Sequence, residues 1–487
     1  MKRNSEITKT NSYSVKIVLI FFIGLSLLFS LAACAKKTDT PVPGENPSSS
    51  EVETASDEGE TTSGSQSTEA QMLEAMKNII LSGGDSVTVA QYFNENIQQA
   101  TPDEADQMLD WLIQMQSGLI QTSHEGLLYE PEYLDALNET MNGILDPDKV
   151  DLIENQEVKA FYHSLLDSDL TLVRYEETPV AEMDWSHIQS LGGSYTEALQ
   201  MMVDFSIYRP LLRDEDVETY VDRIYQMEAQ LMISPDGFGK EKLLELYDDY
   251  VAYALSGPEG SYIYRLQDKS DTYYQKMMAV TSDVKESGFA KVAQTLMSVQ
   301  SADDFMGLMD IVDGYRGDNP YNPRHWTKVT SMQDGLEMTT FSYEGLDPRI
   351  SDKVNELINQ ALDRLVVQSL DGTVDQVSMY RTYGTSKYST IYIYLNYTDQ
   401  DGAFQYKDTS VTLDLDHGTL LDLKSLLKIN ESDFIQTVNA LTDQTFTLPP
   451  KFEVINTGLL LTAQSEDENQ NAFGVITNDI LLKIALQ

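Results

Sequence analysis

The spacing of hydrophobic positions changes once along the chain. From residue 69 to about residue 315 they recur every three or four residues, which is the period of an α-helix. The clearest start signal is Thr101-Pro102-Asp103-Glu104, in which Thr101 suits the N-cap, Pro102 the first helical position and Glu104 the third. The apolar stripe after it contains Met108, Trp111, Leu112, Met115, Leu119 and Ile120. Because only Leu170–Tyr175 looks strand-like, the spacing predicts an all-α helical domain over residues 69–318.

A segment rich in turn-forming residues, 313–323, precedes the change of period. Beyond it apolar residues alternate with polar ones, and a turn at Asp399–Gly402 joins two alternating segments as a hairpin. The predicted strands cover Thr327–Met332, Leu336–Tyr343, Gln376–Tyr383, Tyr388–Thr398, Phe404–Leu415 and Leu459–Thr462. The predicted helices begin at Pro348, Leu421, Glu431 and Thr477. The predicted fold class is therefore multidomain, with the all-α helical domain followed by an α+β domain with an antiparallel sheet over residues 325–487.

The first 33 residues have the pattern of an export signal. The basic residues Lys2, Arg3, Lys9 and Lys16 come first, and residues 17–31 are uncharged and apolar. Those 15 residues are fewer than the roughly 20 that a membrane-spanning helix needs. A cleaved signal peptide is therefore predicted over residues 1–33.

The sequence Leu31-Ala32-Ala33-Cys34 closes the apolar stretch and resembles the lipobox of bacterial lipoproteins. The resemblance implies cleavage before Cys34 and lipid on its thiol, which would attach the chain to the outer face of the cytoplasmic membrane. The alternative is an ordinary signal peptide with a chance cysteine, but Cys34 is the only cysteine of the chain. A single cysteine also leaves no internal disulfide. Residues 34–68, rich in Ser, Thr, Pro, Gly and Glu, are predicted to be a lipid-anchored disordered linker.

Acidic residues outnumber basic ones by 78 to 33, which gives a formal net charge of −45. Nucleic acid binding depends on Lys and Arg side chains that neutralise phosphates, so no nucleic acid partner is expected. The same charge would steer basic partners toward the chain. The alternative is a solvated acidic surface that keeps an exported protein soluble.

The patterns of known catalytic sites are incomplete in this sequence. His124-Glu125 begins like the helix of a zinc peptidase, but Leu128 occupies the position of the second histidine ligand. Ser425 and Lys428 have Ser-x-x-Lys spacing without the companion motifs of acyl-transfer enzymes. No catalytic residue and no cofactor is therefore predicted.

Two further patterns favour structural interpretations. Asp184 and His187 put a carboxylate near an imidazole, for which a capping or surface pair is the simpler interpretation. Asp399, Asp401 and Gly402 match only the start of a calcium loop, so a hairpin turn is predicted and no metal site. A glycosidase needs only two carboxylates at a set separation, and with 78 acidic residues such a pair stays open as an alternative.

One predicted strand carries tyrosine on a single face. Ile391, Ile393 and Leu395 point to one side, and the tyrosines of the same strand point to the other. The predicted ligand-binding residues on this and the preceding strand are Tyr380, Tyr383, Tyr388, Tyr392 and Tyr394. Tyrosine combines apolar area with a polar tip and suits sugar rings and protein partners. The alternative is that these rings lie under the domain's own helix.

Roughly the last third of the chain resembles a known envelope domain. The resemblance rests on Val354–Asn359 in a helix, Val411–Leu423 in a strand and turn, and the strand Gly458–Leu461. It is similar to the uncharacterised extracytoplasmic domain of the lysozyme-sensing anti-sigma factor of Gram-positive bacteria, which also precedes the catalytic part of some peptidoglycan deacetylases. The segment after Thr462 departs from that family because it is short and polar. The resemblance implies an envelope module that binds wall or protein ligands, and it supplies no catalytic residue here.

These observations leave two function classes open. The favoured one is a non-enzymatic, membrane-anchored surface lipoprotein that binds peptidoglycan, another envelope component, or a basic protein such as lysozyme. The alternative is a cell-envelope hydrolase that uses an unidentified carboxylate pair. A solute-binding lipoprotein of a transporter would need alternating β/α units, and the helical part argues against it.

Overall fold

The computed structural model describes residues 65–124, 128, 130–175, 178–208, 217–257, 261–284, 286–299, 308, 311–312, 314–315, 320–321, 326–333, 336–344, 346–367, 372–384, 388–421, 431–442, 451–455, 458–464 and 471–486. The predicted signal peptide with its lipobox at Cys34, residues 34–64 of the predicted linker 34–68, and the helix predicted from Leu421, apart from Leu421 itself, lie outside these ranges. Residues 65–68 of the predicted linker are not disordered chain but the start of helix α2 (Ser65–Leu81).

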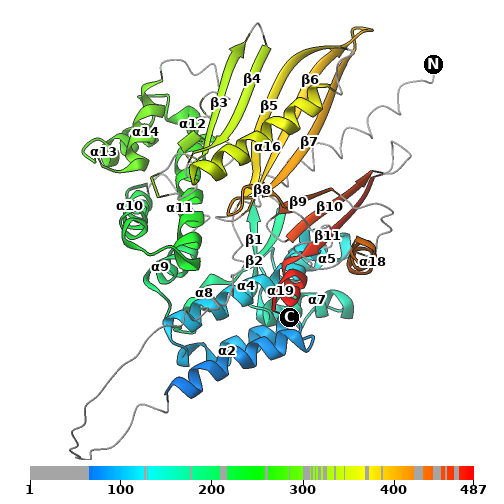
Figure 1. Ribbon diagram of the computed structural model, residues 1–487. Coiled ribbons are helices and arrows are strands. Elements are labelled where there is room, and N and C mark those ends of the chain that lie inside the picture. Colours follow the sequence, from blue (N-terminus) through cyan, green and yellow to red (C-terminus); the bar gives the residue numbers. More distant parts are fainter. Residues whose placement is uncertain are drawn as a thin grey trace, which may run out of the picture.

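The chain up to residue 315 is mainly helical (Figure 1). Its helices are α2 (Ser65–Leu81), α3 (Ser86–Asn96), η1 (Ile97–Gln99), α4 (Pro102–His124), α5 (Pro131–Asp135), η3 (Ala136–Thr140), α6 (Pro147–Val150), α7 (Gln156–Asp167), α8 (Trp185–Ser190), α9 (Glu197–Ser206), α10 (Val217–Ile233), α11 (Phe238–Ser256), α12 (Ser261–Arg265), α13 (Thr272–Thr281) and α14 (Gly288–Ser298). Across the described ranges, no helix combines the length and the apolar character that a bilayer crossing requires.

The start signal at Thr101 forms the predicted cap. Helix α4 begins at Pro102, and the Glu104 carboxylate accepts hydrogen bonds from the backbone N–H and the hydroxyl of Thr101 at 3.0 and 2.9 Å. Both bonds end on the same Glu104 oxygen, and they satisfy the N–H of Thr101, which has no partner within the helix.

The helical part also contains a hairpin of two strands, of which the sequence pattern shows only the first. Strand β1 (Leu170–Tyr175) pairs antiparallel with β2 (Thr178–Met183). The expectation of a single strand-like segment is thus wrong. Pro179 weakens the strand pattern of β2, but β2 pairs only with β1 among the described strands, and an edge strand tolerates proline.

The C-terminal part contains a six-stranded sheet in the order β3-β4-β5-β6-β7-β8 (Figure 1). Its strands are β3 (Trp326–Gln333), β4 (Leu336–Tyr343), β5 (Gly372–Gly384), β6 (Tyr388–Asp399), β7 (Phe404–Asp414) and β8 (Thr419–Leu420). The predicted sheet is confirmed, but it is mixed, because β4 and β5 run parallel while the other neighbours are antiparallel. Helix α16 (Pro348–Val367) connects β4 to β5 and carries the chain back to the starting end, which makes the two strands parallel.

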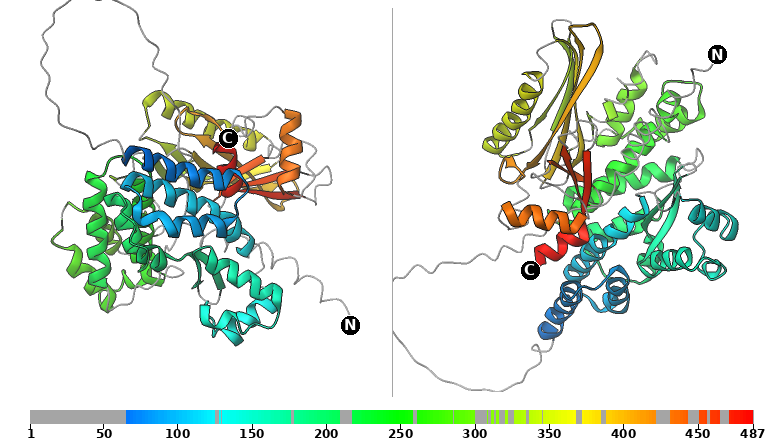
Figure 2. Two further views of the ribbon diagram at one scale, coloured as in Figure 1. Left: turned by 90° about the horizontal axis from the view of Figure 1, so that it is seen from below. Right: turned by 90° about the vertical axis from the view of Figure 1, so that its right-hand side faces the viewer.

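Helix α16 covers one face of this sheet, as the edge-on view in Figure 2 shows. Its apolar residues share a core with the inward-facing residues of the central strands, and this core includes Val354, Ile358, Ala361, Leu365, Val377, Met379, Ile391, Ile393 and Leu395.

The C-terminal segment, residues 431–486, packs against the helical part of the chain. It contains α18 (Glu431–Thr442), β9 (Lys451–Ile455), β10 (Gly458–Gln464), β11 (Asn471–Thr477) and α19 (Asn478–Leu486), and its three strands form a separate antiparallel sheet. Apolar residues of β10 and α19 belong to the same hydrophobic core as α2 to α14, and α19 lies against α4 (Figure 1). The domain boundary predicted between residues 318 and 325 marks the change of period. It does not separate the two hydrophobic cores, because residues 454–482 share a core with the helices that precede the boundary.

A hydrogen bond ties α19 to α4 across 362 residues of sequence: the backbone N–H of Asp479 donates to the Ser117 hydroxyl at 3.1 Å. Replacing Ser117 by alanine should leave this N–H without its acceptor and lower the free energy of unfolding by about 1 kcal/mol. Chemical denaturation measures the loss. Ser123→Ala is the matched control, because the Ser123 hydroxyl donates to Leu119 O within α4. An equal loss in both variants would contradict the role of the bond between α19 and α4.

Candidate functional site

Strand β6 separates aliphatic from aromatic side chains. Ile391, Ile393 and Leu395 are fully buried in the core beneath α16. Because side chains alternate along a strand, Tyr392 and Tyr394 lie on the opposite face of the sheet. The alternative that these rings lie under the domain's own helix is therefore wrong for Tyr392 and Tyr394, which are both partly exposed.

Strand β7 extends this surface with two aromatic residues that the sequence analysis did not single out. Asn396 is paired with Tyr406 and Thr398 with Phe404 in the β6–β7 register, so both rings lie on the same face as the tyrosines. Phe404 is 69% exposed and Tyr406 67% exposed. We call Tyr392, Tyr394, Phe404 and Tyr406 the aromatic face. The same two-residue alternation that marked β6 is present in β7 and could have identified these two residues.

The other predicted tyrosines have different surroundings. Tyr388, at the start of β6, packs against the core shared by the helices and the C-terminal strands, and burial raises the pKa of its hydroxyl. Tyr380 is paired with Tyr392 across β5 and β6, and Tyr383 with Thr390, but their side chains lie outside the described part. Of the five predicted residues, the structure thus describes two, Tyr392 and Tyr394, with partly exposed side chains on this face.

One end of the aromatic face is covered by β9. The hydroxyls of Thr390 and Thr412 contact each other at 3.0 Å, and each binds the backbone of β9, through Val454 N and Phe452 O respectively, both at 3.1 Å. These bonds fix the C-terminal strands against the sheet. The exposed aromatic residues lie toward the other end, near the hairpin turn.

That hairpin turn has the predicted form. The Asp399 carboxylate accepts from the backbone N–H groups of Asp401 and Ala403, and Gly402 has a φ of +77°. These bonds lower the pKa of Asp399. The carboxylate is thereby used within the turn itself, as expected for a hairpin rather than a calcium loop.

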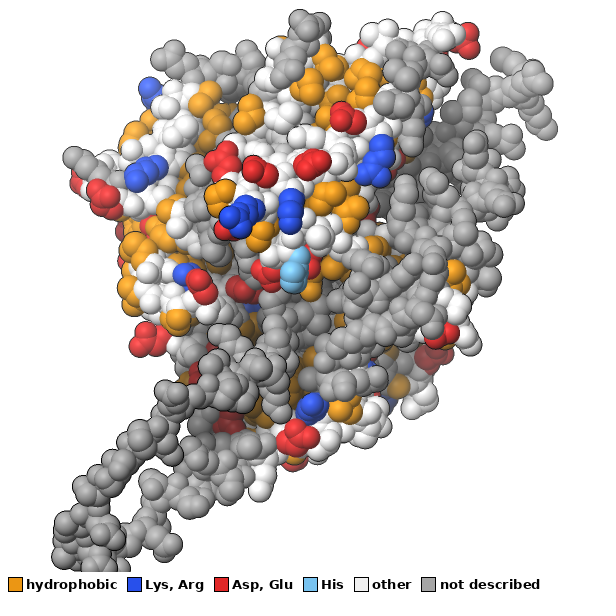
Figure 3. Space-filling view, in the orientation of Figure 1, with side chains coloured by type: hydrophobic (Ala, Val, Ile, Leu, Met, Phe, Trp, Pro, Cys, Tyr) orange, Lys and Arg blue, Asp and Glu red, His pale blue; other side chains and the backbone are white. Residues whose placement is uncertain are grey.

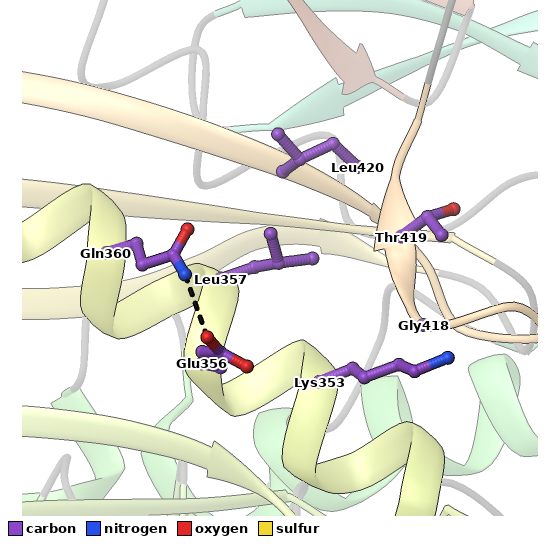
Figure 4. Close-up of a pocket in the computed structure, with 7 residues that line it drawn as sticks. All are labelled: Lys353, Glu356, Leu357, Gln360, Gly418, Thr419 and Leu420. Carbon is purple, nitrogen blue, oxygen red and sulfur yellow. Dashed lines mark hydrogen bonds between the residues drawn. The ribbon is translucent and has the colours of Figure 1, made fainter.

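A second surface feature is an open groove of about 350 Å³ between α16 and the turn before β8 (Figure 4). Its lining residues are Lys353, Glu356, Leu357, Gln360, Gly418, Thr419 and Leu420. Glu356, its one carboxylate, accepts from Gln360 Nε2 at 3.0 Å. On this side of the molecule, acidic and basic side chains are interspersed among hydrophobic ones (Figure 3). The groove can hold a small polar group, but its lining lacks a second carboxylate for acid–base hydrolysis.

Next to this groove, the Asp414 carboxylate raises the pKa of the His417 imidazole above 6.5 through a 2.8 Å contact with Nδ1. Because the folded-state pKa is the higher one, the stabilisation is complete below the unfolded pKa and is lost as pH rises through the folded pKa. His417 is 75% exposed, so the effect on stability should be small. An NMR titration should give a pKa above 6.5 for His417, and Asp414→Asn should return it toward 6.5. An unchanged value in Asp414→Asn would contradict this pairing.

Asp184 caps α8, as expected, while His187 binds a different carboxylate. Asp184 Oδ1 accepts from His187 N at 3.0 Å, and His187 Nε2 lies 3.3 Å from Asp169 Oδ1. Asp169 is buried, has a left-handed φ of +57° and also accepts from Asn94 Nδ2 at 2.9 Å. Burial raises the pKa of Asp169. This is a single carboxylate–imidazole pair, without a nucleophile that any described contact connects to it.

A deeply buried carboxylate with several hydrogen-bond partners belongs to Glu228 on α10. Its Oε1 accepts from the Tyr247 hydroxyl at 2.8 Å and from the backbone N–H of Phe289 at 2.9 Å, and the Tyr321 hydroxyl also binds it. Tyr315 in turn binds the Tyr247 hydroxyl. Burial raises the pKa of Tyr247 well above its ordinary value. Glu228 thus joins three helices to residues 315 and 321, within the segment predicted as a linker, and has no access to a substrate.

Among the described carboxyl groups, burial raises the pKa of Asp106 and of Asp169. Asp106 accepts from the N–H and hydroxyl of Thr196, the N-cap residue of α9, at 3.0 and 2.7 Å, whereas Asp169 accepts from Asn94. Within the described ranges, no group of three or more His, Cys, Asp or Glu side chains is arranged to hold a metal ion.

Comparison with known proteins gives no match to a family model and none to a curated protein. The chemistry of the chain must therefore be argued from the aromatic face, whose exposed rings can stack on a sugar or insert into a protein partner.

Proposed function

We propose that the chain is a non-enzymatic surface lipoprotein whose aromatic face binds a cell-envelope component or a basic envelope protein. The observation that carries this proposal is the pair Phe404 and Tyr406, each about two-thirds exposed, on the sheet face that α16 leaves open. Large aromatic residues are enriched at binding surfaces because they contribute much contact area at little cost in side-chain entropy.

The neighbouring groups suit a polar ligand as well as an apolar one. Asn396 Nδ2 donates to Gln376 Oε1 at 2.9 Å beside the rings, and Asp408 is exposed opposite Tyr394. Sugar rings present an apolar face with hydroxyl groups at their edges, and they match a surface of aromatic rings with amides nearby. A basic protein would find the carboxylate of Asp408 at the same place.

Three features of the sequence support the wider proposal. The lipobox-like sequence that ends at Cys34 supports attachment to the outer face of the cytoplasmic membrane, and the polar residues after it would act as a tether. We propose a multidomain arrangement in which the helical part carries the sheet domain. The resemblance of the last third to the envelope domain of the lysozyme-sensing anti-sigma factor agrees with peptidoglycan or lysozyme as a ligand.

The test is retention of residues 35–487, the mature chain without its lipidated cysteine, on purified peptidoglycan and on immobilised lysozyme at low and moderate salt. The double variant Phe404→Ala/Tyr406→Ala should bind at least about tenfold more weakly, since truncating a well-placed aromatic costs roughly 1–2 kcal/mol. Its stability should change by less than about 0.5 kcal/mol, because both side chains are largely exposed.

The matched control is Val329→Ala/Met332→Ala. These residues are 50% and 67% exposed on β3, at the opposite edge of the same sheet. The control should bind as the unsubstituted chain does. The proposal would be contradicted if the aromatic variant and the control were retained equally on both peptidoglycan and lysozyme.

A further inference from the structure

In β7, every second residue points its backbone N–H and C=O toward β6, and the residues between them point these groups to the outer edge of the strand. Leu421 N donates to Thr412 O at 2.9 Å on the outer side of β7, and Asp399 N donates to Ala403 O at 2.9 Å on the β6 side. The β6–β7 register has no bulge. Because the direction alternates along an antiparallel strand, the residues with outward N–H and C=O groups are Phe404, Tyr406, Asp408 and Ser410.

Strand β8 covers only one end of this edge. It has two residues, Thr419 and Leu420, which pair with Asp414 and Leu413. Among the described strands, none pairs with the outer edge of residues 404–410. An edge of this length is a template for another strand unless it is covered.

The side chains of Phe404, Tyr406, Asp408 and Ser410 all lie on the side of the sheet that carries the aromatic face. A strand added to the edge would therefore place alternate side chains beside Phe404 and Tyr406 while its backbone bonds β7. This combination of main-chain bonds and side-chain contacts is how sheets bind extended peptides.

The acidic charge around this edge favours a basic partner. Residues 396–416 contain one basic residue, Lys407, and five acidic ones, namely Asp399, Asp401, Asp408, Asp414 and Asp416. Lys407 lies over the Tyr397 ring on the α16 side, whereas Asp408 is exposed on the aromatic face. A second copy of the chain would bring Asp408 to an equally acidic edge, and each copy carries a formal charge of −45.

We propose that an extended, basic segment of a partner protein pairs with the outer edge of β7 as an added strand. The inference rests on the proposed function, because the aromatic face supplies the side-chain contacts. The segment would alternate apolar residues, which contact Phe404 and Tyr406, with polar ones, and would place Lys or Arg near Asp408.

The test uses the mature chain and a probe peptide of five Lys-Val repeats with blocked ends. Ser410→Pro removes one outward N–H, which makes no hydrogen bond to β6, and should weaken peptide binding about tenfold. Ser410→Ala keeps this N–H, and its affinity for the peptide should stay within about twofold of that of the unsubstituted chain. The same peptide methylated at every backbone nitrogen has equal charge and should not bind. In the unsubstituted chain, the bound peptide should slow the hydrogen exchange of the backbone amides of residues 404, 406, 408 and 410.

Equal binding by Ser410→Pro and Ser410→Ala, with no slowed exchange at these amides, would overturn the inference. A dimer of the chain that Ser410→Pro dissociates would overturn it as well, because the occupant would then be a second copy. If Phe404→Ala/Tyr406→Ala loses lysozyme or peptidoglycan while Ser410→Pro keeps it, the proposed function stands and the added strand does not.

Discussion

Replacing Glu228 by alanine should lower the free energy of unfolding by about 3 kcal/mol or more, and it should loosen the contacts of Tyr315 and Tyr321. The carboxylate is 4% exposed and accepts from the Tyr247 hydroxyl and the Phe289 N–H. Alanine would leave these buried donors without an acceptor, and each orphaned group costs roughly 1–3 kcal/mol. The cavity left by the side chain adds to the loss. Chemical denaturation gives the size of the effect.

The matched control is Asp222→Ala on the same helix. Asp222 is exposed and accepts from Gln226 Nε2, so its loss should change stability by less than about 0.5 kcal/mol. The account of the Glu228 network would be contradicted if both variants unfolded at the same denaturant concentration.

Replacing Cys34 by serine should abolish lipid attachment. In the proposed lipoprotein the thiol of Cys34 is the sole site for the diacylglycerol, because the chain has one cysteine. Two acyl chains of ordinary length, at about 0.8 kcal/mol per buried CH₂, hold a protein on a membrane stably. The unsubstituted chain should therefore incorporate labelled palmitate and partition into detergent, and Cys34→Ser should incorporate none.

The alternative of an ordinary signal peptide predicts a different result. The unsubstituted chain would then carry no palmitate and would appear in the medium with a free thiol at its processed end. Mass spectrometry of the N-terminal peptide distinguishes the two, since it reads both the cleavage position and the mass added to Cys34.

The sequence predicts local structure well where the signal is local. The cap at Thr101, the boundaries of β6 and β7 and the turn at Asp399 all depend on residues within a few positions of one another. The alternation in β6 also separated Ile391 from Tyr392 correctly, because a strand has a strict period of two.

The features that sequence did not predict depend on distant partners. The bond from Asp479 to Ser117 joins residues 362 positions apart, and no periodicity records it. The parallel pairing of β4 with β5 depends on the path of the α16 connection rather than on the strands themselves. Tyr388 shares the tyrosine pattern of β6 yet packs against the C-terminal core, because the placement of β9 decides which end of the face stays open.

The most direct test of the central claim is photo-cross-linking in the native cell envelope. A photoreactive phenylalanine derivative replaces Tyr406 in one strain and Tyr264, a 50% exposed tyrosine of the helical part, in another. The aromatic face predicts a cross-link to peptidoglycan or to a basic envelope protein from position 406, and none to the same ligand from position 264. A ligand captured from position 264 and not from position 406 would place binding on the helical part and contradict the account.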